Sequence, residues 1–112
     1  MKKYFVFLLL PAFMILQFCS SSKKAKAAFT FEDNVKPLVS VKCAPCHTTG
    51  NKSHLVEYPI AKEKADSILY RIQLNPDQKG FMPFKHDKLS DSAINVFLQW
   101  KAGGLLEKKA NP

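Results

Sequence analysis

The sequence predicts an all-helical domain of about eighty residues. Three segments repeat apolar residues at the spacing of one helical face, and residues typical of helix caps bound them. No segment alternates strongly between apolar and polar residues, and the chain has no internal repeat. In a chain of 112 residues this is one small domain, and domains with so small a core often need a cross-link or a cofactor.

The N-terminus is not expected to belong to that domain. Lys2 and Lys3 precede an apolar run over 4–18, which is shorter than the ~20 residues of a spanning helix but suits an export signal. The run ends at Cys19 and resembles a bacterial lipoprotein leader, which implies cleavage there and lipidation of Cys19. Because Phe18 stands where that leader has a small residue, an uncleaved anchor or another cleavage site remain alternatives. All of them place the domain outside the cytoplasm.

The expected organisation has four parts. Residues 1–18 form a signal peptide, 19–28 a lipidated cysteine with a polar tether, 29–107 the folded domain and 108–112 a C-terminal tail. Cleavage would leave Met82 as the single methionine, because the other two lie in the leader.

The first helix is expected within residues 29–43. Thr30, with Asp33 three positions later, predicts an N-terminal cap. Pro37 is tolerated only in a first turn, so the regular helix is expected to begin near Asn34. The positions at helical spacing are Val35, Leu38, Val39 and Lys42.

Two further helices are expected, over 62–75 and 89–104. The apolar face of the earlier one consists of Ala65, Ile68, Leu69 and Ile72. The face of the later one consists of Ala93, Ile94, Phe97, Leu98 and Trp100. Ser90 predicts the N-cap of the later helix, and Gly103-Gly104 predicts a left-handed C-cap.

The stretch CAPCH, from Cys43 to His47, carries the chemistry. A thioredoxin-like site would place CxxC after a strand, and no parallel-sheet pattern surrounds it. A structural zinc needs four ligands, which would add His54 or His86 to Cys43, Cys46 and His47, although adjacent Cys46 and His47 are poor joint ligands. The third interpretation is covalent haem c: two thiols add to the two vinyl groups of one porphyrin edge, and the histidine that follows lies under the iron. Such attachment takes place outside the bacterial cytoplasm, where the leader sends the chain.

Residues 29–107 resemble the small class I cytochromes c. The resemblance rests on CAPCH and on weaker elements in the same order. These are Phe31, Val35, Pro37 and Leu38 before it, and Ser67 with Leu69, Met82-Pro83, and Trp100 with Gly104 after it. The family implies a helical fold around one haem, with the first and last helices crossing near the haem edge. It also implies that a loop methionine is the second axial ligand.

Met82 fits that implication, because it lies in a loop and is the single methionine of the cleaved chain. Pro83 would stiffen the backbone, and Phe81 and Phe84 would shield the ligand from water. His86 is the alternative ligand, followed by His54, and packing in the core is the other interpretation of Met82.

Ligation by His47 and Met82 would raise the reduction potential and leave iron no open position. The predicted function is therefore electron transfer rather than catalysis. Three alternatives stay open: a haem-based gas or redox sensor, a peroxidase-like enzyme, and a haem subunit of a larger oxidoreductase.

The charge pattern bears on partners. The formal net charge is +8, and four lysines flank the two ligand segments: Lys42, Lys79, Lys85 and Lys88. They predict a redox partner with an acidic docking patch, although a solvated surface is the simpler interpretation of any one lysine. Export argues against nucleic acid as the partner. The expected location is the periplasmic side of a bacterial membrane, with a lipid anchor at Cys19.

Overall fold

The computed structural model describes residues 27–47 and 53–111, and all regular structure in those ranges is helical. The elements are η1 (Phe31–Val35), α1 (Lys36–Lys42), α2 (Ala44–His47), α3 (Tyr58–Glu63), α4 (Ala65–Gln73) and α5 (Asp91–Ala102). The all-α prediction is confirmed for these residues. The leader, Cys19 and most of the tether lie outside the described residues.

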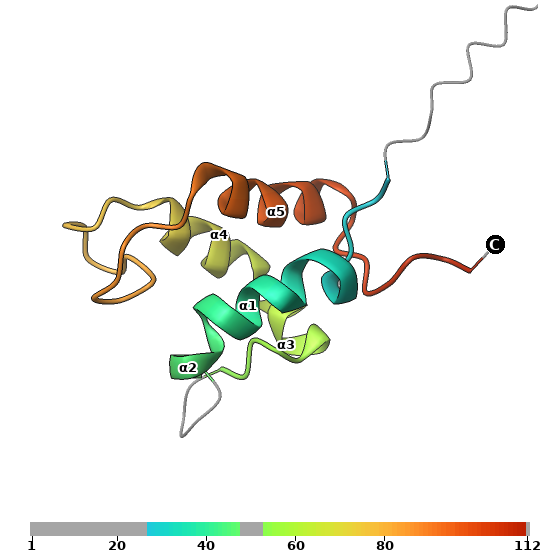
Figure 1. Cartoon of the computed structure of the whole chain (residues 1–112), viewed down its shortest axis with the longest axis horizontal. Helices are drawn as coiled ribbons and strands as arrows, with labels where there is room; N and C mark the ends of the chain where they lie inside the picture. The colour runs from blue at the N-terminus through green and yellow to red at the C-terminus, as the bar shows by residue number, and fades with distance from the viewer. Residues whose placement is uncertain (1–26, 48–52, 112) are drawn as a thin grey trace, which may run out of the picture.

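The helices form two packed groups. In the first group, η1 continues directly into α1. In the second, α4 packs along α5, and α3 contacts α4 (Figure 1). η1 also contacts α5, so the first and last helical segments meet. The buried apolar side chains from all these elements form one continuous core, of which Trp100, Phe31 and Phe97 are the largest fully buried members.

The first helical segment is capped as predicted, and a π-helical turn precedes its regular helix. The Thr30 hydroxyl accepts a hydrogen bond from Asp33 N at 3.3 Å, and Asn34 Oδ1 accepts one from Thr30 N at 2.9 Å. The regular helix α1 begins at Lys36, close to the predicted start near Asn34, and Pro37 lies in its first turn as predicted. The prediction missed the π-helical turn η1, which precedes α1.

α4 buries the predicted apolar face, since all four of its predicted residues are buried. α3 was missed: the predicted helix over 62–75 covered only its end. Lys64, with φ −90° and ψ 2°, separates the two helices, so α4 begins at Ala65. Pro59 in the first turn of α3 is the sequence signal that could have located it.

α5 is capped at both ends as predicted. The Ser90 hydroxyl accepts from Ala93 N at 3.3 Å, and Gly104 has the left-handed φ of +88°. The predicted apolar face is only partly correct, because Leu98 is 41% exposed. Leu98 follows Phe97 by one residue and so lies about 100° around the helix from that buried ring.

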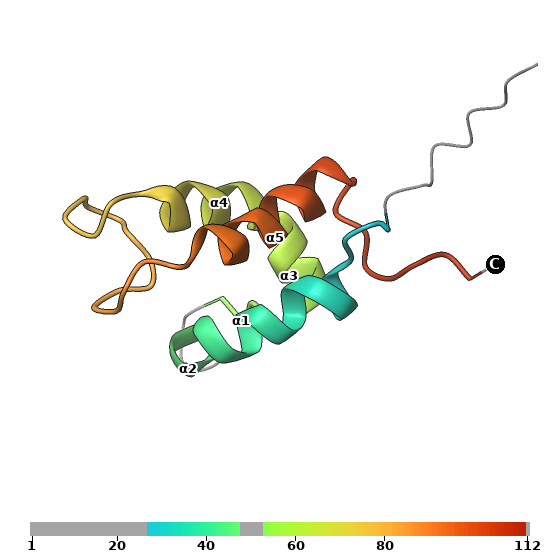
Figure 2. The ribbon, with the colours of Figure 1, turned by 45° about the horizontal axis from the view of Figure 1, so that its top comes forward.

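The chain after α5 returns to η1. The carbonyl of Leu106 accepts hydrogen bonds from Trp100 Nε1 at 2.9 Å and from Phe31 N at 2.8 Å. Tyr58 Oη donates to the Leu105 carbonyl at 2.9 Å. Both ends of the described chain therefore lie side by side, and the loop between α4 and α5 occupies the opposite end of the molecule (Figure 2).

Candidate functional site

CAPCH forms a single helical turn directly after α1. Cys43 N donates to the Val39 carbonyl at 2.8 Å, and the Cys43 carbonyl accepts from Cys46 N at 3.1 Å and from His47 N at 2.9 Å. The three chemically active residues are therefore related as i, i+3 and i+4. Residues at such positions are neighbours on one face of a helix.

The two thiols of CAPCH differ in environment. Cys43 and Cys46 form no disulfide; Cys43 is half-buried against the core, and Cys46 is exposed. Burial raises the pKa of the Cys43 thiol to about 11, so this group is protonated at neutral pH. Thiol redox sites depend on a lowered pKa that yields a reactive thiolate. The environment of Cys43 therefore gives no support to the thioredoxin-like alternative.

The imidazole of His47 is half-buried and unpaired. Its Nδ1 is buried without a hydrogen-bond partner. Leaving a buried polar nitrogen unpaired is costly, so a histidine in this state is a candidate for a ligand role. The Nε2 atom of His47 forms no hydrogen bond to any described residue. Residues 48–52, which follow His47, lie outside the described residues.

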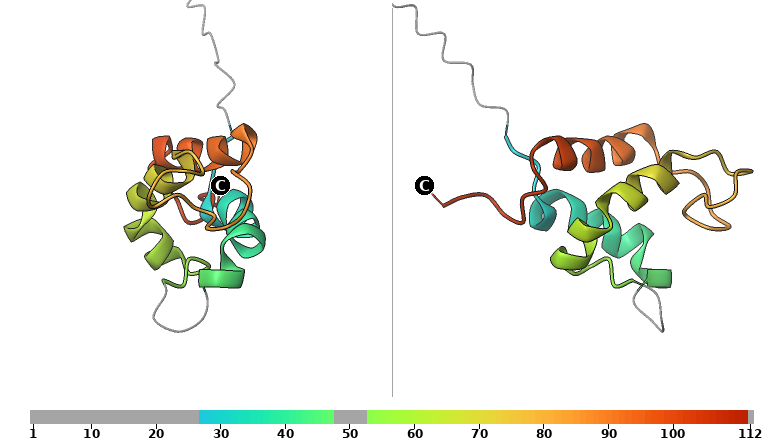
Figure 3. Two further views of the ribbon diagram at one scale, coloured as in Figure 1. Left: turned by 90° about the vertical axis from the view of Figure 1, so that its left-hand side faces the viewer. Right: turned by 180° about the vertical axis from the view of Figure 1, so that it is seen from behind.

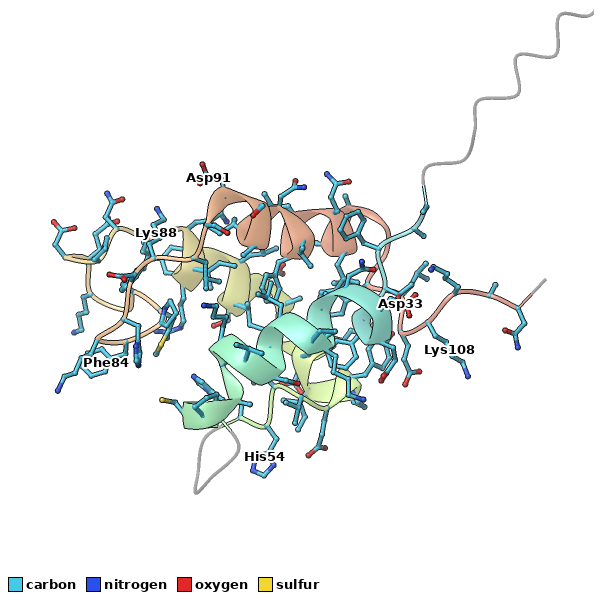
Figure 4. The ribbon with its side chains drawn as sticks, in the orientation of Figure 1. Asp33, His54, Phe84, Lys88, Asp91 and Lys108 are labelled. Carbon is cyan, nitrogen blue, oxygen red and sulfur yellow. The ribbon has the colours of Figure 1, made fainter. Side chains whose placement is uncertain are left out.

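Met82 lies in the long connection between α4 and α5, residues 74–90, here called the Met82 loop. Met82 is half-buried and its backbone N donates to the Arg71 carbonyl at 3.2 Å. Phe81 is 6% exposed, as its predicted shielding role requires, but Phe84 is 65% exposed. The shielding role predicted for Phe84 is therefore wrong. Its ring points out of the loop, where Lys85 Nζ lies 5.3 Å from the ring centroid (Figure 4).

The fold brings the Met82 loop and α2 to the same end of the molecule, away from the two chain ends (Figure 3). A cavity of about 500 Å³ opens within the loop itself, and residues between Pro76 and His86 line it. No residue of CAPCH belongs to that lining. The two predicted ligand segments thus share one end of the molecule, and this cavity does not join them.

The alternative ligands His54 and His86 lie at the surface. His54 is on the connection before α3, where its Nδ1 is 3.4 Å from a carboxylate oxygen of Glu57, and it points away from the helices (Figure 4). His86 is exposed at the edge of the loop cavity. Within residues 27–47 and 53–111, no three His, Cys, Asp or Glu side chains gather closely enough to share a metal ion. The geometry therefore gives no support to a structural zinc site made from these residues.

All four predicted docking lysines are exposed. Lys88 Nζ donates to the Gln73 carbonyl at 3.1 Å, which ties the end of the Met82 loop to α4. None of the four forms an ion pair with a described acidic residue, although the same loop also carries Asp77 and Asp87.

Comparison of the chain with protein-family models, with curated proteins and with solved structures returned no match. A helix with the length and apolar character to cross a bilayer is absent from the part of the chain that the structure describes.

Proposed function

We propose that this chain is a single-haem c-type cytochrome that carries electrons outside the cytoplasm, with a fold like that of the small class I cytochromes c. The observation that carries the proposal is the turn at α2. Together with Cys43, which precedes it, this turn carries two thiols without a disulfide and an imidazole whose buried Nδ1 has no partner, at positions i, i+3 and i+4. This arrangement matches the covalent attachment chemistry of haem c.

The residues present fit such a group. Cys43 and Cys46 would each add a thiol across a vinyl group and so become thioethers. His47 would bind iron through Nε2. Its Nδ1, which is buried without a partner, would then donate a hydrogen bond to an acceptor on a neighbouring segment. The haem, when bound, supplies one-electron chemistry through the Fe(II) and Fe(III) states.

The packing of the Met82 loop also supports the proposal. Phe81 is buried, yet it is not a member of the continuous core formed by the helices. The loop therefore has one buried ring of its own, Phe81, besides Leu89, which belongs to the helical core. An apolar cofactor in contact with Phe81 and with that core would add burial to a domain whose own core is small.

In this proposal Met82 would be the second protein ligand that holds the haem iron. A thioether ligand favours reduced iron, and an occupied position excludes water and substrates from the metal. Because substrates would have no access to the iron, such a site is suited to electron transfer rather than to catalysis. The anchor at Cys19, the periplasmic location and an acidic partner surface belong to the same proposal.

Spectroscopy of the exported, purified protein tests the proposal. We expect a haem that stays with the polypeptide under denaturing conditions, a methionine–iron charge-transfer band in the oxidised form, and no change when carbon monoxide is added to the reduced form. Loss of the haem on denaturation would refute covalent attachment. A reduced form that binds carbon monoxide readily would favour the sensor or peroxidase-like alternatives.

A further inference from the structure

Arg71, which sequence reasoning did not single out, contacts the Met82 loop twice. Its backbone carbonyl accepts the hydrogen bond from Met82 N at 3.2 Å. Its guanidinium Nη1 donates to the Gly80 carbonyl at 3.1 Å. One residue near the end of α4 thus holds both ends of the segment 80–82, which is otherwise irregular.

The glycine in that segment is needed for the contact. Gly80 has φ of +96°, a conformation that side chains rarely adopt. A Cβ atom built there would lie 3.3 Å from Arg71 Nη1 and 3.8 Å from Leu74 Cδ1. A side chain at this position would be strained by the positive φ, and the guanidinium would have to shift by a few tenths of an ångström to make room for it.

The Arg71 side chain is oriented toward the loop from its own helix. Its Nε donates to the Ser67 hydroxyl one helical turn earlier, at 3.4 Å. No described carboxylate forms an ion pair with the guanidinium. Its hydrogen bonds to other residues are thus divided between its own helix and the Met82 loop.

We propose that Arg71 is a positioning residue for Met82, holding the thioether at the height and direction at which it can bind iron. The inference rests on the proposed function, because it takes Met82 to be the second axial ligand. An axial methionine exchanges between bound and unbound states, and a loop already held in place binds with a smaller loss of conformational freedom. A single hydrogen bond of ordinary strength changes such an equilibrium by about two- to ten-fold.

The test compares Arg71→Ala, Arg71→Lys and the control Lys62→Ala in the haem-loaded protein. Lys62 is also an exposed helical cation, but its Nζ lies over the ring of Tyr58, away from the Met82 loop. In Arg71→Ala we expect a weaker methionine–iron band and an increase of about two- to ten-fold in carbon monoxide binding to the reduced form. Amide exchange at Met82 should become faster. Arg71→Lys, which retains one donor, should fall between Arg71→Ala and the wild type, and Lys62→Ala should match the wild type.

Gly80→Ala provides a second test from the loop side. Its Cβ would strain the backbone at a φ of +96° and would crowd the guanidinium, so it should weaken the same band although Arg71 is still present. If Arg71→Ala and Gly80→Ala lowered stability to denaturant but left the band and carbon monoxide binding unchanged, Arg71 would be structural only and the inference would be overturned. A wild-type protein without the band would instead refute the proposed ligation by Met82, and the comparison among variants would not be reached.

Discussion

Trp100 Nε1 donates a hydrogen bond to the carbonyl of Leu106 at 2.9 Å. That carbonyl also accepts from Phe31 N at 2.8 Å, and the rings of Phe31 and Trp100 lie 5.8 Å apart between centroids. The indole therefore connects the last helix, the chain that follows it and the first helical segment. The start of η1 and the chain that follows α5 lie at the end of the molecule opposite the Met82 loop (Figure 2).

Trp100→Phe should lower the free energy of unfolding of the haem-loaded protein by about 1–3 kcal/mol. The smaller ring leaves a gap at a fully buried position and removes one of the two donors to the Leu106 carbonyl. Denaturant unfolding followed by far-UV circular dichroism measures the change. Leu98→Ala, on the same helix but exposed, should change stability by less than about 0.5 kcal/mol. Equal effects of the two variants would contradict the importance of this contact.

Cys43→Ala combined with Cys46→Ala should abolish covalent haem and leave the domain largely unfolded, because the small core then lacks the group proposed to complete it. Haem staining after denaturing electrophoresis and circular dichroism provide the two measurements. Cys19→Ala is the matched control, since it removes a thiol outside CAPCH and should retain the haem. A folded, stable double variant without haem would show that the polypeptide core suffices.

Met82→Ala should keep the covalent haem, lower the reduction potential and allow carbon monoxide to bind the reduced iron. The thioether stabilises reduced iron, and its removal opens the second axial position. Redox titration and absorption spectra measure both effects. Phe84→Ala is the control in the same loop, and the exposure of that ring predicts little change. If Met82→Ala had the wild-type spectrum and His86→Ala did not, His86 would be the ligand.

Cys19→Ala should release the protein from membranes or block its processing, while haem attachment survives. The leader-like sequence ends at this cysteine, which is the residue that would carry the lipid. Metabolic labelling with a fatty acid, followed by membrane fractionation, measures the effect. Unlabelled wild-type protein would identify a plain signal peptide or an uncleaved anchor instead.

The rate of electron transfer to the physiological partner should fall as ionic strength rises. Attraction between exposed charges is screened over ~10 Å at 0.1 M salt. The double charge reversal Lys79→Glu with Lys85→Glu should weaken this dependence, because both lysines lie on the Met82 loop. Lys62→Glu with Lys108→Glu is the matched control. Lys62 lies on α3, and Lys108 lies at the end of the molecule opposite Lys88 (Figure 4). Rates that are flat across salt concentrations would leave the loop lysines with a solubilising role only.

Local sequence predicted the helical class, the apolar face of α4 and the caps at Thr30 and Ser90. These features depend on interactions between residues a few positions apart, namely helical periodicity and side-chain capping of nearby backbone groups. It also determined the i, i+3, i+4 relation within CAPCH, because the spacing becomes a shared face as soon as that stretch is helical.

Only the tertiary structure decided how distant segments meet. The return of the chain from Gly104 to Phe31, the exposure of Phe84 and the contact of Arg71 with the Met82 loop all depend on packing between segments far apart in sequence. No local sequence pattern encodes such contacts, because they form when whole helices pack against one another. The backbone groups of an irregular loop then pair with whichever donors and acceptors lie close by.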